Sequence, residues 1–216
     1  MISSPHPSPP LSSTSAASDL LDQSALSSLA ERLVEAARRA GADAADAVAV
    51  RGVSQGVEVR DGRVEGSERS EGDDVGLRVL VGRRQAVVST NDVGGDNVAK
   101  LAERAVAMAR VAPDDKYVGL ADPALLARDF PDLDLLDPLT PSAAELERRA
   151  VAAEAAALAV KGVTKSGGAS ASTGIGGMVL VTSTGFHGSY LRSSQGISVT
   201  AIVGDGTGME RDYDYS

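Results

Sequence analysis

The first element that the hydrophobic pattern predicts is a helix from about Ser24 to Arg39. Its apolar residues recur every three or four positions, which places them on one helix face. They are Leu26, Leu29, Ala30, Leu33, Val34 and Ala37. A capping box at Ser28 and Glu31 would start this helix, with Asp22 or Ser24 as alternative starts. Gly41 is placed to end it.

Apolar and polar residues alternate beyond Gly41, which predicts strands. Val57–Glu65 alternates around Asp61-Gly62, and an Asp-Gly pair supplies the positive φ angles of a tight hairpin. The remaining patterns are strands at 47–51, 77–81 and 85–90, a turn at Gly82-Arg83, and a helix at 96–110 that ends before Pro113.

Composition changes at 113–139, where prolines interrupt a run of Asp, Leu and Ala. This segment is predicted to be a linker. Because a solvated linker does not need so many large apolar residues, we expect it to wrap over the surface and bury several of them. These are Leu125, Phe130, Leu133 and Leu136. A helix follows from Ser142, which has capping-box spacing to Glu145, to about Val160, and Gly162 ends it.

The same order of elements then returns. Strands are predicted at 169–173, 178–182, 187–191 and 197–203, with turns at Thr184-Gly185 and Gly204-Asp205. Helix stop and turns recur at offsets of 121 (162 − 41), 123 (185 − 62) and 122 (204 − 82) residues. Nearly constant offsets indicate duplication of a helix-plus-four-strand module, against the alternative of a chance similarity.

These patterns predict an α+β fold of two repeated helix-plus-antiparallel-strand modules, with sheets packed against helices and one continuous core. The expected domains are a disordered Ser/Pro-rich tail at 1–20, a first module at 21–112, the linker at 113–139, and a second module at 140–216. The second module lacks the helix that closes the first, so we expect a truncation before a carboxyl-terminal domain. The tail has neither the basic start nor the apolar run of a signal peptide.

Composition excludes several classes of function. The net charge is -9 and the pI about 4.7. Such acidity repels phosphate backbones, so no nucleic-acid partner is expected. Without Cys there are no disulfides or thiolate metal sites, which fits a reducing cytoplasm. The chain has no run of about 18 apolar residues, so no membrane span is predicted.

Candidate catalytic residues are few. Zinc peptidases of the H-E-x-x-H type use paired histidines, whereas this chain has only His6 and His187, far apart. A Ser-His-Asp arrangement would need His187 with Ser183, Ser189 or Ser193. A lone histidine on a half-exposed strand is the favoured interpretation, because no G-x-S-x-G elbow is present.

Glycine-rich and acidic segments are also open to two interpretations. Lys165–Gly168 and Gly174–Gly177 lack the frames of phosphate-binding loops and are interpreted as turns at strand ends. Acidic pairs could bind a hard cation or act as acid and base, but solvated loops are favoured. These pairs are Asp73-Asp74, Asp114-Asp115 and Asp212/Asp214. Sheet edges could accept an extended peptide. No catalytic, cofactor-binding or metal-binding residue is assigned.

Three passages carry a resemblance to a known family. They are Val75–Asp92, Gly119–Pro123 with Asp129–Leu135, and Gly208–Ser216. Together they resemble the PmbA (TldE) branch of the TldD/PmbA metallopeptidase family, which also carries the label modulator of DNA gyrase. The similarity extends from about Leu26 to Ser216, as expected for the amino-terminal part of such a protein.

The resemblance implies a non-catalytic, cytoplasmic subunit in a heterodimer or larger assembly. Its TldD-like partner would hold zinc through an H-E-x-x-x-H motif, so no cofactor is expected in this chain. The implied substrates are unfolded or short peptides, among them peptide antibiotics that require leader removal and unstable antitoxins. No residue of the catalytic motif matches a position here, so no role is transferred. The alternatives are a peptide- or protein-binding adaptor without a peptidase partner, and a self-sufficient hydrolase around His187.

Overall fold

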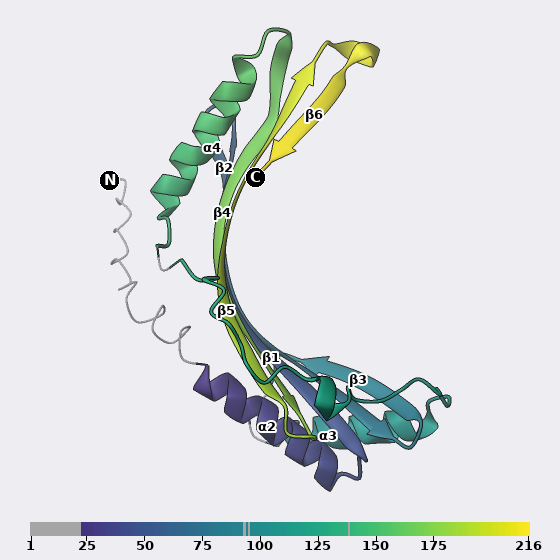
Figure 1. Cartoon of the computed structure of the whole chain (residues 1–216). Coiled ribbons are helices and arrows are strands. Elements are labelled where there is room, and N and C mark those ends of the chain that lie inside the picture. Colours follow the sequence, from purple (N-terminus) through teal and green to yellow (C-terminus); the bar gives the residue numbers. More distant parts are fainter. Residues whose placement is uncertain (1–22, 93, 95, 138) are drawn as a thin grey trace, which may run out of the picture.

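One antiparallel sheet of six strands runs through the computed structural model, in the order β3-β2-β1-β4-β5-β6 (Figure 1). The structure describes residues 23–92, 94, 96–137 and 139–216, so the predicted tail and His6 lie outside the described residues. The strands are β1 (Ala44–Arg60), β2 (Arg63–Val81), β3 (Arg84–Thr90), β4 (Val163–Thr182), β5 (His187–Val203) and β6 (Glu210–Tyr215). The helices are α2 (Ser24–Arg39), α3 (Asn97–Val111) and α4 (Ala143–Leu158), with short 3-10 helices η1 (Pro123–Leu125) and η2 (Gly206–Gly208).

The sheet is strongly curved, and its helices lie on the convex side (Figure 1). α4 covers one end of that side, and α2 and α3 cover the other. No described helix covers the concave face. The predicted α+β class, with antiparallel strands packed against helices, is therefore confirmed.

The two modules are arranged symmetrically about the centre of the sheet. From the central β1–β4 pair outward, the strands follow as β1, β2, β3 in one direction and β4, β5, β6 in the other. Equivalent glycines have equivalent backbones, with φ of 100° at Gly41 and 101° at Gly162, and 59° at Gly82 and 73° at Gly204. Glycine adopts such positive angles more readily than residues with a side chain. The predicted repeat is thus present in the fold, with two long strands and one short strand in each copy instead of four strands.

Several predicted strands merge because glycines interrupt the apolar pattern without interrupting the strand. The segments predicted at 47–51 and 57–60 are parts of β1, and those at 169–173 and 178–182 are parts of β4. Likewise, 187–191 and 197–203 both belong to β5. Glycine usually weakens a strand because it offers no side chain to pack, but here the backbone ladder continues through it.

The prediction of one continuous core is wrong, because the buried apolar residues form two separate clusters. The larger lies beneath α2 and α3 and includes Leu33, Leu77 and Val106. The smaller lies beneath α4 and includes Leu146, Val59 and Ala171. Helices cover only the two ends of the sheet, so its middle has no apolar layer to bury.

Each end depends on strands from both modules. α2 packs against β4 as well as β1 and β2, and α4 packs against β1 as well as β4 and β5. β1 contributes Ala47 and Ala49 to the larger cluster and Val57 to the smaller. Neither helix therefore covers a sheet made by its own module alone.

The helix termini test the predicted caps. α2 starts at Ser24 after Gln23, which makes no side-chain cap, so the proposed box at Ser28 and Glu31 is wrong and the alternative start is right. α4 starts as predicted, because the Ser142 hydroxyl accepts a hydrogen bond from the Glu145 N–H at 3.2 Å.

Unequal burial at the two ends predicts unequal effects of the same substitution. Val79 on β2 is 0% exposed beneath the helices, whereas Val203 near the end of β5 is 38% exposed. Val79→Ala is expected to lower the free energy of unfolding by about 2 kcal/mol, through lost burial and a residual cavity. Val203→Ala is expected to lower it by less than about 1 kcal/mol. Urea unfolding followed by circular dichroism measures both, and equal losses would contradict the uneven burial.

Candidate functional site

The acidic residues that the sequence singled out are mostly in strands. Asp73 lies in β2, where Arg51 Nε and Nη2 donate to its two carboxylate oxygens at 2.7 and 2.6 Å. These hydrogen bonds and the nearby positive charge lower the pKa of Asp73, despite the opposing effect of burial. Asp212 and Asp214 lie in β6. For both pairs the solvated-loop prediction is wrong, because regular ladder pairing includes them.

The third acidic pair does lie in a loop, as predicted. Asp114 accepts a hydrogen bond from Arg84 Nε at 2.7 Å, and Asp115 accepts one from the Tyr117 N–H at 2.9 Å. Both carboxylates therefore fix the start of the linker. Within the described residues, no group of three His, Cys, Asp or Glu side chains is placed to hold a metal ion.

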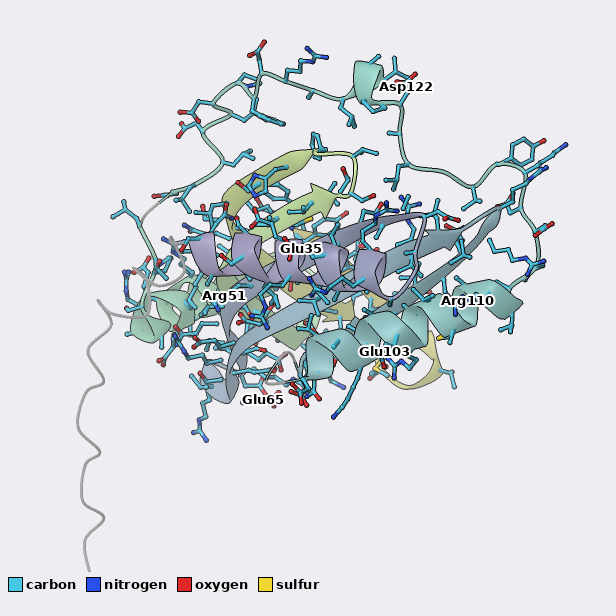
Figure 2. The ribbon with its side chains drawn as sticks, turned by 90° about the horizontal axis from the view of Figure 1, so that it is seen from below. Glu35, Arg51, Glu65, Glu103, Arg110 and Asp122 are labelled. Atoms are coloured by element: carbon cyan, nitrogen blue, oxygen red, sulfur yellow. The ribbon has the colours of Figure 1, made fainter. Side chains whose placement is uncertain are left out.

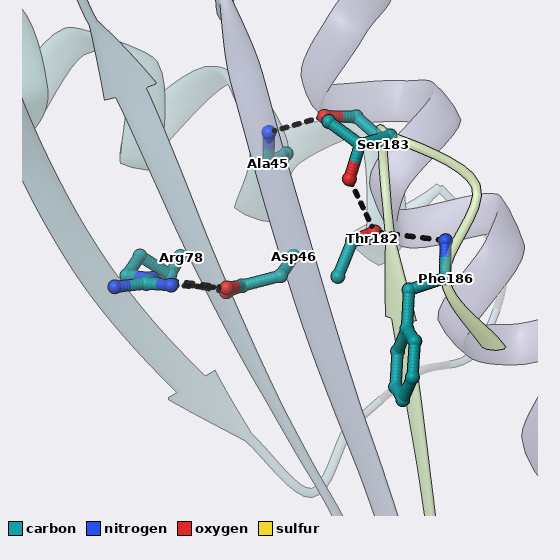
Figure 3. A network of polar contacts seen from close by, with 7 residues as sticks. Ala45, Asp46, Arg78, Thr182, Ser183 and Phe186 are labelled. Carbon is teal, nitrogen blue, oxygen red and sulfur yellow. Dashed lines mark hydrogen bonds and ion pairs between the residues drawn. The ribbon is translucent and has the colours of Figure 1, made fainter. Parts of the chain in front are cut away.

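His187 has a serine neighbour other than the three serines that the sequence analysis considered. His187 Nε2 lies 3.2 Å from the Ser27 hydroxyl of α2. Ser183 instead accepts from the Ala45 N–H at 3.0 Å (Figure 3), and Ser193 accepts from the Asp137 N–H at 2.8 Å. Ser189 is exposed on β5. His187 thus joins a strand end to a helix, and its partner on α2 was not visible in the linear pattern.

Polar contacts at this end of the sheet are structural. Thr182 accepts a hydrogen bond from the Phe186 N–H at 3.1 Å and closes the β4–β5 turn (Figure 3). Asp46 pairs with Arg78 directly across β1 and β2, which raises the pKa of the Arg78 guanidinium. Such cross-strand ion pairs fix the register of the sheet.

The glycine segments that were interpreted as turns lie inside β4. Gly168 has a φ of 109° beside irregularities in the β4–β5 pairing, and its N–H donates to the Ser166 hydroxyl at 2.9 Å. Gly174–Gly177 runs through the middle of the sheet, where Gly176 is paired with Gly52. The turn prediction is wrong here, because these glycines are strand residues. They leave the backbone at the centre of the sheet without side chains above it, and we call this stretch the glycine floor.

That glycine floor forms a trough in the middle of the sheet. Register partners project to the same side of a sheet, and Gly52, Gly72 and Gly176 alternate with the residues of the helix-covered face. The trough has a volume of about 490 Å³, and its polar lining includes Asp74 and Arg192. Glycines in a strand permit close approach of another backbone.

A second, more apolar groove adjoins the trough at the linker. Its volume is about 630 Å³, and it is lined by Phe130, Leu133, Leu180 and Phe186, among others. Met178 and Tyr190 line both hollows and connect them. The two therefore form one continuous surface, which we name the trough-and-linker surface.

The linker itself is held by backbone contacts instead of by buried side chains. Ser193 N–H donates to the Leu135 carbonyl at 2.9 Å. In Figure 2 the linker arches away from the sheet near Asp122. Leu125, Phe130 and Leu133 are exposed and only Leu136 is half-buried, so the predicted burial of the first three is wrong.

The outer edge of β5 is only partly paired. β6 pairs with Ser198–Val203, and the part of β5 from His187 to Gly196 lies outside that pairing, with its Ser193 N–H bonded to the linker carbonyl of Leu135. Unpaired strand edges can add an extended peptide through backbone hydrogen bonds. The trough-and-linker surface and the rest of this edge thus offer the kinds of noncovalent contact by which proteins hold extended peptides.

A buried carboxylate that the sequence did not bring to attention holds the turn between β1 and β2. Glu154 is 2% exposed on α4 and accepts the N–H groups of Asp61 at 3.0 Å and Gly62 at 2.7 Å. Burial alone would raise its pKa, but hydrogen bonds from Ser166, Gly62 and Asp61 outweigh burial and lower the pKa. The sequence contains one signal for this role: Glu154 follows Leu146 and Ala150 at the four-residue spacing of an apolar helix face, where an acidic side chain needs a partner.

Comparison with known proteins defines the class to which this architecture belongs. The profile for PmbA/TldA metallopeptidase domain 1 matches residues 45–109, and that for the central domain matches residues 136–216. The two domains occur in order on one curved sheet. The chain belongs to the PmbA/TldD metallopeptidase family.

Relatives within the family are PmbA proteins. The chain is 35% identical over 185 residues to the metalloprotease PmbA homolog of Haemophilus influenzae, covering 85% of this chain and 41% of that protein. It is 34% identical over 161 residues to metalloprotease PmbA of Escherichia coli O157:H7, covering 74% of this chain and 36% of that protein. The chain thus spans about two fifths of the curated relatives it matches.

Solved structures share the fold at lower identity. A protein described as a modulator of DNA gyrase from Bacteroides thetaiotaomicron superposes with a TM-score of 0.78 at 22% identity, covering 87% of this chain and 44% of that one. TldE from Thermococcus kodakarensis gives 0.67 at 14% identity, covering 87% and 42%. None of the described helices is long and apolar enough to cross a membrane.

Glu154 predicts a pH-dependent contribution to stability. Glu154→Gln keeps the size of the side chain but places an amide donor against a backbone N–H, so we expect a loss of about 2 kcal/mol at neutral pH. Because the folded pKa is lowered, the contribution is present above the ordinary Glu pKa of 4.5 and is lost as pH falls through the folded value. Urea unfolding should show a smaller difference in unfolding free energy between the wild type and Glu154→Gln at pH 3 than at pH 7. The same difference at both pH values would contradict a charged, hydrogen-bonded Glu154.

Proposed function

We propose that this chain is the amino-terminal part of a PmbA/TldE-type subunit that presents unfolded or short peptides to a zinc-bearing, TldD-like partner. The observation that carries the proposal is the similarity to two PmbA proteins at 35% and 34% identity. The order of domain 1 and central domain also supports it. The proposed setting is the cytoplasm, and the proposed substrates include peptide antibiotic precursors and unstable antitoxins.

The proposal assigns the zinc to the partner. This chain contains two His and no Cys, and the catalytic H-E-x-x-x-H motif implied for TldD-like subunits has no counterpart in its sequence. Its contribution would be to hold the peptide while the partner's metal polarises the scissile carbonyl and activates water.

The trough-and-linker surface suits an extended peptide. The glycine floor lets a peptide backbone approach, while Phe130 and Phe186, with ring centroids 6.2 Å apart, border a hollow for an apolar side chain. Asp74 and Arg192 in the polar lining can pair with charged or polar groups of the peptide. Recognition based mainly on the backbone would tolerate many sequences.

Zinc content and partner dependence test the assignment. The full-length polypeptide that carries this chain should bind no stoichiometric zinc and cleave no peptide alone, whereas its mixture with the TldD-like subunit should do both. Plasma emission spectrometry and a fluorogenic peptide assay measure the two properties. Stoichiometric zinc in the isolated polypeptide would contradict the proposal.

A substitution in the trough tests the role of the surface. A Cβ at Gly72 meets no atom within 4 Å, so Gly72→Val should fold normally while it fills the glycine floor. We expect cleavage by the assembled complex to fall about tenfold through a higher KM, as expected for a loss of roughly 1.4 kcal/mol in binding. The control is Gly76→Val, which lies on the same strand with equal space but outside the trough. Equal activity of the two variants would remove the trough from the proposal.

The second candidate is a peptide- or protein-binding adaptor that works without a peptidase. The observation that favours it is that the trough, the linker groove and the partly unpaired edge of β5 all belong to this one chain. Affinity purification from the native cell separates the candidates. Recovery of a protein with H-E-x-x-x-H supports the first, and peptide binding with persistent absence of such a protein supports the adaptor.

A further inference from the structure

Three glycines lie in one row across the middle of the sheet, on the face that no described helix covers (Figure 1). Gly52 of β1 is paired with Gly72 of β2 on one side and with Gly176 of β4 on the other. None of the three has a positive φ, and a Cβ on any of them would meet nothing closer than 3.6 Å. Neither backbone geometry nor packing within the described part of the chain therefore requires glycine here. The effect of the three glycines is to leave the floor of the trough open.

The rows next to these glycines form two unlike walls. Both rows project to the same face as the glycines, because they lie two residues away along each strand. One row carries three largely apolar residues, and the other carries three serines. They are Val50, Met178 and Tyr190 in the apolar wall, and Ser54, Ser70 and Ser194 in the serine wall. The trough is thus a channel that crosses the strands between an apolar and a hydroxyl-bearing wall.

Only two residues in these three rows are charged, and they lie at opposite ends of the channel. Asp74 stands at the β2 end of the apolar wall, and Arg192 stands at the β5 end of the glycine row. Neither side chain has a salt bridge or hydrogen bond to another described residue. Asp46 and Arg78, further along the same face, are by contrast paired with each other. The channel therefore has an unpaired negative charge at one end and an unpaired positive charge at the other.

The spacing of the strands sets the length of peptide that reaches both charges. Neighbouring strands lie about 4.8 Å apart, so β2 and β5, three spacings apart, are separated by about 14 Å. An extended peptide advances about 3.3 Å per residue, so its first and fifth residues lie about 13 Å apart. Its side chains alternate in direction, so the first, third and fifth residues face the same wall. A segment of five residues therefore fits the channel.

The two ends of the channel differ in what lies beyond them. At the β5 end the linker lies beside Arg192, because the N–H of Ser193 donates to the Leu135 carbonyl at 2.9 Å. At the β2 end no described strand lies beside Gly72, because β3 pairs only with Val75–Val81. A peptide can therefore continue over the β2 edge, whereas the linker obstructs continuation past β5. The positive charge at the obstructed end suits a terminal carboxylate.

We propose that the trough binds peptides in one polarity, with a free carboxyl terminus at Arg192 and a lysine or arginine four residues earlier at Asp74. The inference rests on the proposed function, because it names the class of peptide that this surface presents. Arg192 lies in the glycine row, in line with the peptide backbone, and its guanidinium can donate two parallel hydrogen bonds to a carboxylate. Asp74 lies in the apolar wall, which the side chain of the first peptide residue faces.

Isothermal titration calorimetry of the full-length polypeptide that carries this chain tests the polarity. The probe is acetyl-Lys-Ser-Val-Ser-Leu, whose serines face the serine wall while its lysine, valine and leucine face the other. Amidation of its carboxyl terminus should weaken binding about fivefold, as expected for loss of one exposed ion pair. The isomer acetyl-Ser-Lys-Val-Ser-Leu turns the lysine to the wrong wall and should lose about the same factor. Four added alanines should be tolerated at the amino end and should weaken binding at the carboxyl end.

Substitutions in the trough assign each effect to its residue. Arg192→Gln should weaken binding of the probe about fivefold and remove its sensitivity to amidation. Asp74→Asn should weaken binding by a similar factor and make the two isomers bind equally. The controls are Arg83→Gln and Glu68→Gln, which make the same charge changes at exposed positions outside the trough and should leave the affinity unchanged.

The outcomes separate this inference from the proposed function. Equal affinity for the free and the amidated probe, or no binding of any of the peptides, would overturn the inference. If the complex with the TldD-like partner still cleaves peptides in that case, the proposed function stands. Selectivity for the free carboxyl terminus and the correctly placed lysine, without cleavage by the complex, would support the inference and contradict the proposed function. Loss of affinity in the control variants equal to that in Arg192→Gln and Asp74→Asn would also overturn the inference, since overall charge would then explain the binding.

Discussion

The pairing of β1 with β4 is the interaction on which the rest of the structure depends. The two strands run antiparallel from Asp46 opposite Thr182 to Val59 opposite Ala169, and this ladder alone joins the two halves of the sheet. Because both strands extend into both apolar clusters, each cluster uses strands from both modules. A hydrophobic core with few aromatic residues depends on such shared surfaces, since Ala and Val bury little area individually.

The same ladder explains where the molecule offers surface to other molecules. Gly52 and Gly176, in the central stretch of β1 and β4, project to the face opposite the helices, so they remove no side chain from either apolar cluster. That stretch forms the trough, and the linker borders its apolar continuation. Charged groups nearby and at the end of the sheet have structural partners, as Arg51 has Asp73 and Glu154 has the β1–β2 turn. The trough therefore combines a glycine floor with polar and apolar side chains around it.

Sequence patterns identified the elements whose causes are local. The stripe of α2, the Asp61-Gly62 turn, the Ser142 cap and the repeat all follow from spacing or backbone preference within short segments. Strand continuity through Gly52 and Gly176 could not be predicted, because the partner strand that holds those glycines extended lies about 120 residues away (176 − 52 = 124). Exposure of Phe130 and Leu133 and the role of Glu154 depended likewise on contacts between distant segments. The family was identified from motifs, whereas the candidate surface required the fold.

The most direct test of the central role of the β1–β4 pairing is to break it at its middle. Val53 lies opposite Ile175 close to the centre of both strands, and proline there removes a backbone donor from a central strand. Hydrogen exchange read by mass spectrometry can then follow α3, which packs on α2, β2 and β3, and α4 at the other end. If the pairing supports both clusters, Val53→Pro removes the protection of α3 and α4 together. Retention of wild-type protection in α3 after its loss in α4 would contradict this account.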